Sequence, residues 1–373
     1  MNKYPLLIST DIGTDPDDAI AVYLSTRRPE IELKGVWVTN GDVRTRARIA
    51  RKLLNYSGNR VRVLLGEAEP ISGLEPYMHG YEKGFLTPRE VYRSQKWDIE
   101  EYGLAAVEKM LDAESEIYVL SIAPMTNIAK LLRRKPNAPG KIKRIYIMGT
   151  RLGADEHNVH HDVRAAQEVF NSDLNLTIVP ANICDRYGLD YAHLMYGNQR
   201  TRAVEFISNM ASAWRIYRTS IEFAKIPQML YKARMQVGKR IDGDKFIDLQ
   251  NAIEHLRTTR QPEDLEKLWS HSLLLRGIVN TNPEFRDIEE YMDAQTPKEL
   301  NVHDAYTIFC MLYPDSIRTT NVSIAVDNNG LVDVSSGGRH EFVMDLDYKR
   351  FMEFLYEGLG IKTRDYSAKR LQT

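Results

Sequence analysis

Acidic side chains are concentrated near the start of the chain. Asp11, Asp15, Asp17 and Asp18 fall within eight positions, directly after the apolar run 6–10. Packing several carboxylates together is unfavourable unless a cation neutralises them. Oxygen ligands without His or Cys suit Ca²⁺ or Mg²⁺, so this segment predicts a divalent cation site.

The same acids also fit an ordinary helix start. Asp15 is a good N-cap and Pro16 suits the first helical position. Asp17 and Asp18 complement the positive end of the helix dipole. Asp11 is left unexplained, because it stands at the end of the apolar run. The segment lacks the Gly and Glu positions of an EF-hand loop and the Gly-Lys-Ser/Thr of a P-loop.

Two further groups of polar residues could act on a ligand. His303 precedes Asp304 at a helical pattern, and a His can exchange a proton near neutral pH; taken alone, the pair could simply begin that helix. Glu156 and Asn158 are two positions apart and would point the same way in an extended segment, or belong to a solvated loop. The histidines at 157, 160 and 161 invite a zinc interpretation, but no Cys or distant His motif completes it.

Aromatic residues in the second half of the chain could stack on a planar ligand. Trp214, Tyr217 and Tyr231 occur in a region of helical spacing. Residues at such spacing are more often part of a core, which is the expectation for each of them.

The elements that must position these residues alternate between strand and helix. Continuous apolar runs, typical of strands covered on both faces, occupy residues 6–10, 33–39, 61–65, 117–122, 145–148 and 176–179. Helical patterns occupy residues 17–27, 46–56, 104–111, 126–133 and 164–170. This alternation predicts an α/β fold with a mainly parallel, open twisted sheet flanked by helices.

The second half of the chain has a different texture. Residues 187–299 show apolar residues at helical spacing, which predicts a mostly helical excursion packed on the sheet that could act as a lid. A helix is expected at 304–312, strands joined by turns at 322–326, 331–334 and 342–344, and a last helix at 348–359. No linker or repeat interrupts the chain, so residues 1–373 are expected to form a single domain.

The overall composition limits the classes of partner. The chain has 373 residues and is 43% hydrophobic, which is enough for a large core. The 50 basic and 51 acidic side chains give no electrostatic footprint for a nucleic-acid polymer or an anionic membrane. Cys184 and Cys310 are expected to be buried free thiols. Without a membrane-length apolar run or a signal-peptide core, a cytoplasmic location and a small-molecule substrate are expected.

Several short motifs occur in the order seen in one known family. They are Asp11-Ile12-Gly13, Asp17-Asp18-Ala19, Gly41-Asp42, His79-Gly80, Ala123-Pro124-Met125-Thr126-Asn127-Ile128-Ala129, Glu156-His157-Asn158-Val159, Asp162 and Val302-His303-Asp304-Ala305. In these motifs the sequence resembles the nucleoside hydrolases of the inosine–uridine-preferring type. The resemblance covers nearly the whole chain outside residues 187–299. It implies hydrolysis of the N-glycosidic bond of a ribonucleoside to ribose and free base, in nucleoside salvage.

The resemblance also implies a role for individual residues. Asp11, Asp18, Asp304 and the carbonyl of Ile122 would bind Ca²⁺. Asp11 would also be the general base for the attacking water, and His303 would be a leaving-group acid or a contact to the base. The substrate would be bound by residues from four further motifs: Asp17, Asp42, His79, Glu156 and Asn158. A homo-oligomer, either a dimer or a tetramer, is expected by the same resemblance.

The sequence departs from the family pattern at several positions. Ser9 stands where the family often has Asp, and Asp42 stands where Asn is usual. Two extra residues separate Asp11 from Asp17, so Asp15 could take over part of the neighbourhood of Asp11.

These departures leave other interpretations open. The segment between Gly149 and Glu156 is short and lacks an Asn that reaches the sugar, and Arg151 within it could accept a phosphorylated or modified substrate. The fold could also serve as a non-catalytic module that binds a nucleoside or ribose. A Mg²⁺-dependent phosphohydrolase would likewise use an Asp after its first strand, but its Asp-x-Asp spacing is absent because Gly13 follows Ile12.

Overall fold

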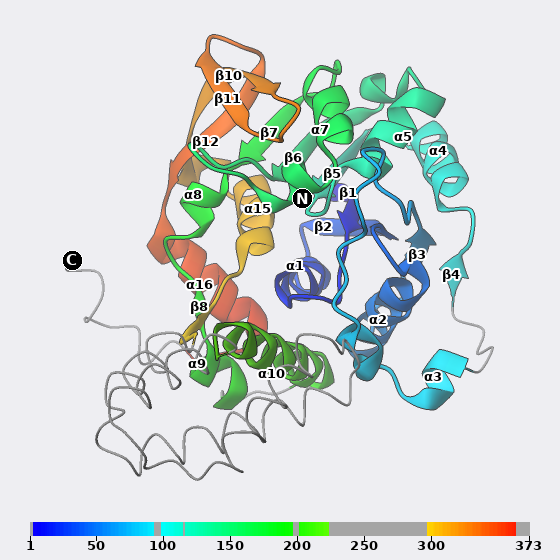
Figure 1. Cartoon of the computed structure of the whole chain (residues 1–373), viewed down its shortest axis with the longest axis vertical. Coiled ribbons are helices and arrows are strands. Elements are labelled where there is room, and N and C mark those ends of the chain that lie inside the picture. Colours follow the sequence, from blue (N-terminus) through cyan, green and yellow to red (C-terminus); the bar gives the residue numbers. More distant parts are fainter. Residues whose placement is uncertain (1–2, 93–97, 115, 197–200, 224–296, 363–373) are drawn as a thin grey trace, which may run out of the picture.

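A ten-stranded sheet forms the centre of the molecule (Figure 1). The computed structural model describes residues 3–92, 98–114, 116–196, 201–223 and 297–362. The strands follow the order β11 (Val332–Ser336), β10 (Ile317–Val326), β12 (His340–Leu346), β7 (Leu176–Val179), β6 (Ile142–Met148), β5 (Ile117–Ser121), β1 (Tyr4–Thr10), β2 (Ile31–Val38), β3 (Arg62–Leu65) and β4 (Ile99–Glu100).

Most of the sheet is parallel, as predicted. Every neighbouring pair from β12 to β4 runs parallel, and β10 runs antiparallel to both β11 and β12. The predicted α/β fold with a mainly parallel sheet is therefore confirmed. β10 begins at Ile317 rather than at Val322, because its polar, exposed first half still pairs with β12 through the backbone.

Helices cover both faces of the sheet (Figure 1). One layer contains α1 (Asp17–Thr26), α2 (Val43–Tyr56), α15 (His303–Leu312) and α16 (Tyr348–Leu359), and the other contains α4 (Gly103–Ala113), α5 (Thr126–Arg134) and α7 (Val163–Phe170). Successive side chains of a strand point to opposite faces. Leu6 and Ile8 of β1 accordingly belong to the hydrophobic core between the sheet and the first helix layer. Leu7 belongs to the core between the sheet and the second layer.

Shorter elements complete the described structure. They are the 3₁₀ helices η1 (Tyr81–Phe85), η2 (Ala138–Gly140) and η4 (Pro314–Ser316), and the helices α3 (Pro88–Tyr92), α6 (His157–His161) and α8 (Ala181–Cys184). Cys184 and Cys310 are buried free thiols, as predicted.

The segment 187–299 is only partly described. Its described parts are β8 (Leu189–Asp190), α9 (Tyr191–Tyr196), α10 (Arg202–Phe223) and the start of β9 (Glu299–Leu300). β8 and β9 pair antiparallel, so the two ends of the segment meet in a small sheet, while α9 and α10 make its longer described elements helical, as predicted. Apolar residues at helical spacing also predict helices at 246–256 and 265–278, and both ranges lie outside the described residues. The lid role of the segment stays a prediction.

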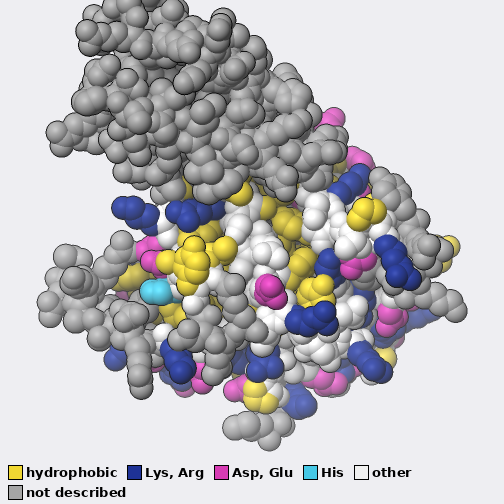
Figure 2. Space-filling model, turned by 90° about the horizontal axis from the view of Figure 1, so that it is seen from below, with side chains coloured by type: hydrophobic (Ala, Val, Ile, Leu, Met, Phe, Trp, Pro, Cys, Tyr) yellow, Lys and Arg dark blue, Asp and Glu magenta, His cyan; other side chains and the backbone are white. Residues whose placement is uncertain are grey.

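The described surface agrees with the near-equal numbers of basic and acidic side chains in the sequence. Lys and Arg side chains are interspersed with Asp and Glu on the face in Figure 2, without a continuous region of one sign among the described residues. Within the described part of the chain, no helix is both long and apolar enough to cross a membrane.

Candidate active site at the carboxyl ends of the strands

A cavity of about 400 Å³ lies where several parallel strands end. Asp11 follows β1, Ile122 follows β5, and Met148 is the last residue of β6, and all three line the cavity. Parallel strands present their carboxyl ends at one edge of a sheet, where ligands of open α/β folds bind. The rest of the wall comes from the starts of α1, α6, α9 and α15, one side of α10, the segment 297–301 and Tyr77.

Eight of the predicted site residues meet at this cavity. They are Asp11, Asp17, Asp18, Ile122, Glu156, Asn158, His303 and Asp304. α15 packs directly against α1, which brings Asp304 from near the end of the chain to the acids at its beginning.

Asp42 and His79 do not line the cavity. The carboxylate of Asp42 caps α2, accepting from the backbone N–H of Thr45 at 3.0 Å and from its hydroxyl at 2.7 Å. The ring of His79 stacks on Tyr217 with centroids 4.2 Å apart, and it contacts Tyr77, which does line the cavity. Asp42 and His79 thus have partners outside the cavity lining, and their contacts to substrate stay predictions.

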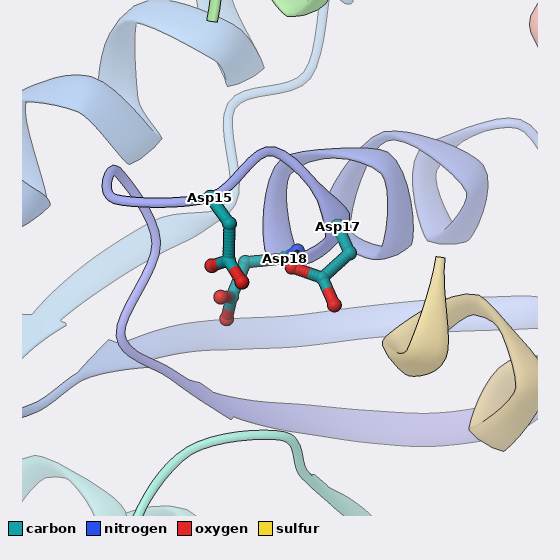
Figure 3. Close-up of side chains that lie close together, drawn as sticks. All are labelled: Asp15, Asp17 and Asp18. Carbon is teal, nitrogen blue, oxygen red and sulfur yellow. Dashed lines mark hydrogen bonds between the residues drawn. The ribbon is translucent and has the colours of Figure 1, made fainter. Parts of the chain in front are cut away.

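The acids at the start of α1 point toward one another (Figure 3). Asp15, Asp17 and Asp18 each offer a carboxylate oxygen within 4.8 Å of the others. Asp15 does not act as the helix cap considered from the sequence, because the N-cap is Pro16 and no side chain caps α1. Its carboxylate therefore joins the acidic group, which lies in the same cavity as Asp11 and Asp304.

Burial and crowding oppose the charged form of these acids. Burial raises the pKa of Asp17, Asp18 and Asp304 well above the usual range, and neighbouring carboxylates raise each pKa further. A divalent cation would relieve both effects, since it supplies the compensating charge that the carboxylates lack. The donor atoms are carboxylate oxygens and the wall includes Ile122, so the site fits a hard cation such as Ca²⁺.

Two residues that sequence reasoning missed hold Asp11 in place. Asn40 donates from Nδ2 to Oδ2 of Asp11 at 3.1 Å and accepts at Oδ1 from the backbone N–H of Tyr77 at 3.0 Å. The fully buried Arg46 donates to the carbonyls of Asp11, Ile12, Asn40 and Tyr77. The only signal for these residues in the sequence is the pair Asn40-Gly41 after the second strand, which predicts a turn.

Glu156 and Asn158 reach the cavity from a helix start rather than from an extended segment. Glu156 is the N-cap of α6, and its carboxylate accepts from the backbone N–H groups of Asn158 and Val159, both at 3.0 Å. Asn158 donates from Nδ2 to the carbonyl of Met148 at 3.1 Å. The expected extended geometry is wrong, because the Glu side chain satisfies the free N–H groups of a helical turn.

The neighbouring histidines do not converge as a zinc site would require. His160 points its Nδ1 to the carbonyl of Asn329 at 3.0 Å. The rings of His157 and His161 stack on each other with centroids 5.2 Å apart, and His157 also lines the cavity.

His303 has a charged partner that the sequence did not suggest. Its Nε2 lies 3.1 Å from Oδ1 of Asp185. Arg151 donates to both carboxylate oxygens of Asp185 and does not line the cavity, so the contact to a modified sugar suggested for Arg151 has no support in this geometry. His303 and then Arg151 hold the pKa of Asp185 well below its usual range.

Aromatic side chains form a less polar wall. Tyr77, Tyr191 and Trp214 line the cavity, and Arg218 lies over the ring of Trp214 at 5.5 Å. Trp214 is partly buried and packs against the hydrophobic core, as expected, and it also lines the cavity. Tyr217 packs on His79, and Tyr231 lies outside the described residues.

Comparison with known proteins identifies the family of this chain. Residues 6–353 match the family model described as inosine-uridine preferring nucleoside hydrolase. Uridine nucleosidase 1 of Arabidopsis thaliana is 31% identical over 229 residues, which are 56% of this chain and 66% of that protein. The pyrimidine-specific ribonucleoside hydrolase RihA of Escherichia coli O81 (strain ED1a) is 28% identical over 203 residues, which are 51% and 61% of the two chains. The chain thus spans just under two thirds of the length of these relatives.

Solved structures share the fold. A purine-preferring ribonucleoside hydrolase from Gardnerella vaginalis superimposes with a TM-score of 0.62 at 17% identity, covering 95% of this chain and 98% of that chain. A plant nucleoside hydrolase superimposes with a TM-score of 0.60 at 16% identity, with the same coverage. With the family model extending over nearly the whole sequence, the chain belongs to the family of inosine–uridine preferring nucleoside hydrolases.

Proposed function

We propose that this chain hydrolyses the N-glycosidic bond of a ribonucleoside, releasing ribose and the free base. One observation carries the proposal: acids from both ends of the chain, Asp11, Asp18 and Asp304, share one cavity. Its volume of about 400 Å³ falls within the range of small-molecule sites. The printed names of the relatives, a uridine nucleosidase and a ribonucleoside hydrolase, support the same reaction.

The chemistry sets three tasks for the site. Departure of the base leaves positive charge on the ribose, so the transition state resembles a ribosyl cation. The attacking water must lose a proton, the charged sugar must be stabilised, and the base must receive the electron pair of the broken bond. Carboxylates and an imidazole are suited to these tasks.

The carboxylates fit Ca²⁺ as the bound cation. Asp11, Asp18, Asp304 and the carbonyl of Ile122 would hold it, with Asp15 beside them. When bound, Ca²⁺ lowers the pKa of a water ligand and orients it. The 6–8 oxygen ligands that Ca²⁺ takes leave room for substrate oxygens in addition to those of the protein.

Asp11 would accept the proton of the attacking water. Asn40 donates to Oδ2 of Asp11, so Oδ1 remains to accept that proton. General-base catalysis of this kind contributes roughly 10²–10⁴-fold in rate. Asp17, Glu156 and Asn158 line the same cavity and would orient the ribose hydroxyls. The surrounding negative charge stabilises the developing positive charge on the sugar.

The base would occupy the aromatic side of the cavity. Tyr77, Tyr191 and Trp214 offer ring surface against which a nucleobase can pack. As the C1′–N bond breaks, its electron pair goes to the base nitrogen, which takes a proton from His303. The water oxygen forms the new bond to C1′ and passes its proton to Asp11, so that ribose and neutral base are the products. Release of free base suits a role in nucleoside salvage, and the family resemblance predicts a homo-oligomer.

Ribose release from a nucleoside panel tests the proposal. Purified protein is incubated with uridine, cytidine, inosine and adenosine, before and after chelation, and reducing sugar is measured. We expect release from at least one nucleoside, loss after chelation and recovery with added Ca²⁺. Binding of nucleosides without any ribose release would favour the non-catalytic binding module, and phosphate release from phosphate esters would favour the phosphohydrolase.

A further inference from the structure

A carboxylate outside the cavity contacts the imidazole proposed to serve the leaving base. Asp185 directly follows the short helix α8, and its Oδ1 lies 3.1 Å from Nε2 of His303, the first residue of α15. The side chain of His303 is 16% exposed and that of Asp185 is 38% exposed. The contact between His303 and Asp185 therefore lies at the edge of the cavity wall, between the end of α8 and the start of α15.

The carboxylate of Asp185 is itself held in place. Arg151 donates to both of its oxygens, and the bond from Nη2 to Oδ1 measures 3.2 Å. Two-point pairing of this kind fixes the plane of a carboxylate. Further bonds join the same two segments, from the N–H of Leu152 to Oδ1 of Asn182 at 2.7 Å and from the N–H of Ala181 to the carbonyl of Thr150 at 2.9 Å.

The contact constrains which ring nitrogen can serve the substrate. An imidazole has two nitrogens, and the partner of one determines the role of the other. Nε2 is buried beside Asp185 and pairs with it by charge, without the alignment of a hydrogen bond. Nδ1 is therefore the nitrogen that can meet a ligand in the cavity that His303 lines. We propose that Asp185 is a positioning residue that holds His303 by Nε2, so that Nδ1 gives its proton to the departing base nitrogen. This inference rests on the proposed function.

The proton transfer balances without any further reactant. The electron pair of the C1′–N bond moves to the base nitrogen, and the proton on Nδ1 forms the new N–H bond there. The proton on Nε2 stays on His303 beside the carboxylate of Asp185, and solvent returns a proton to Nδ1 after the products leave. The low pKa of Asp185 keeps its carboxylate charged over the pH range in which the enzyme would work.

Two substrates with different leaving groups test the inference. Uridine loses a base that needs a proton, whereas 4-nitrophenyl β-D-ribofuranoside loses a stable nitrophenolate that does not. With the Ca²⁺-loaded enzyme, we expect Asp185→Asn to lower kcat/KM for uridine about 10- to 100-fold, within the range of acid catalysis. The same variant should keep kcat/KM for the aryl riboside within about two-fold. If uridine is not hydrolysed by the wild type, inosine replaces it.

Matched variants separate positioning from a general disturbance. Arg151→Gln should act in the same direction with a smaller loss, because it only loosens the carboxylate. Asp173→Asn removes a carboxylate that also pairs with an arginine, Arg339 at 2.9 Å, but is more exposed and distant from His303 in the sequence, and it should change neither rate. The Ca²⁺ affinity of Asp185→Asn, measured by calorimetry, should equal that of the wild type.

The outcomes are distinguishable. Equal losses on both substrates, or no loss on either, overturn the role of Asp185 while leaving the hydrolase proposal intact. A lowered Ca²⁺ affinity in Asp185→Asn would also overturn it, because the effect would then arise at the metal site. If the wild-type enzyme releases ribose from neither nucleoside nor aryl riboside, the proposed function is wrong, and this inference is then wrong as well.

Discussion

Nδ2 of Asn40 lies 3.1 Å from Oδ2 of Asp11, joining the turn after β2 to the end of β1. Asn40 adopts a left-handed conformation with φ 69°, which Asn tolerates better than most residues. Asn40→Ala should lower kcat by about 10-fold, because Asp11 loses the donor that orients it. It should also lower the free energy of unfolding by roughly 1 kcal/mol through the strained φ. Ribose release and urea unfolding measure the two effects.

Asn40→Gly is the matched control for the strain. Glycine adopts the left-handed conformation freely, so this variant removes the amide without the backbone cost. We expect the loss in kcat to persist in Asn40→Gly while most of the stability returns. Full activity in Asn40→Gly would show that the side chain does not orient the general base.

Arg46 should be more important for stability than any exposed arginine. It is fully buried, and its guanidinium donates to four backbone carbonyls around the acidic loop. Arg46→Met leaves these carbonyls without their donor and should cost about 3–5 kcal/mol in the free energy of unfolding. Arg44→Met, which breaks an exposed pair with Glu101, should cost less than about 1 kcal/mol. Equal destabilisation by the two variants in urea would contradict this ranking.

Much of the fold could be predicted from local sequence. The buried strands are continuous apolar runs because helices cover both faces, and β7 and α16 begin and end where the pattern placed them. The rule that ligands bind beyond parallel strand ends, together with the family motifs, predicted a common site for Asp11, Asp18 and Asp304, and all three line the same cavity.

The missed residues act through partners that sequence spacing does not show. Asn40 and Arg46 bind across 29 and 35 positions, the latter through backbone carbonyls that any residue type carries. Asp185 meets His303 only because α8 and α15 pack together. Asp42, which the family motif predicts as a substrate contact, also caps α2 with its carboxylate, a role that the motif does not show.

Stabilisation by Ca²⁺ should increase with pH. The folded-state pKa values of Asp17, Asp18 and Asp304 are raised above the ordinary value of 3.8, chiefly by burial. The metal-free folded state therefore binds more protons than the unfolded state, so these acids destabilise it increasingly as pH rises above 3.8. Ca²⁺ competes with those protons, and its affinity should rise over the same interval.

Thermal unfolding at several pH values measures this linkage. At a free Ca²⁺ concentration of 100 times Kd, binding should add about 2.7 kcal/mol to the free energy of unfolding. The gain in Tm from a fixed Ca²⁺ concentration should be larger at pH 8 than at pH 5. Asp18→Asn should reduce the gain at both pH values. A gain that is independent of pH would contradict a site built from these buried acids.

The identity of the general base can be decided between two neighbouring acids. Asp11 is oriented by Asn40, whereas Asp15 lies in the tight group with Asp17 and Asp18. Asp11→Asn should therefore lower kcat by at least about 100-fold without changing the fold. Asp15→Asn should mainly weaken Ca²⁺ binding, with a smaller effect on kcat at saturating Ca²⁺, because the other acids remain to bind the cation.

Measuring both variants at saturating Ca²⁺ separates catalysis from metal binding, since each affinity is determined independently by calorimetry. Circular dichroism and Tm with bound Ca²⁺ serve as the control for folding. If Asp11→Asn is fully active and Asp15→Asn is not, Asp15 is the base, and the two extra residues before Asp17 have moved that role along the loop. The loop geometry favours Asp11, because the hydrogen bond from Asn40 leaves one of its oxygens available to a water.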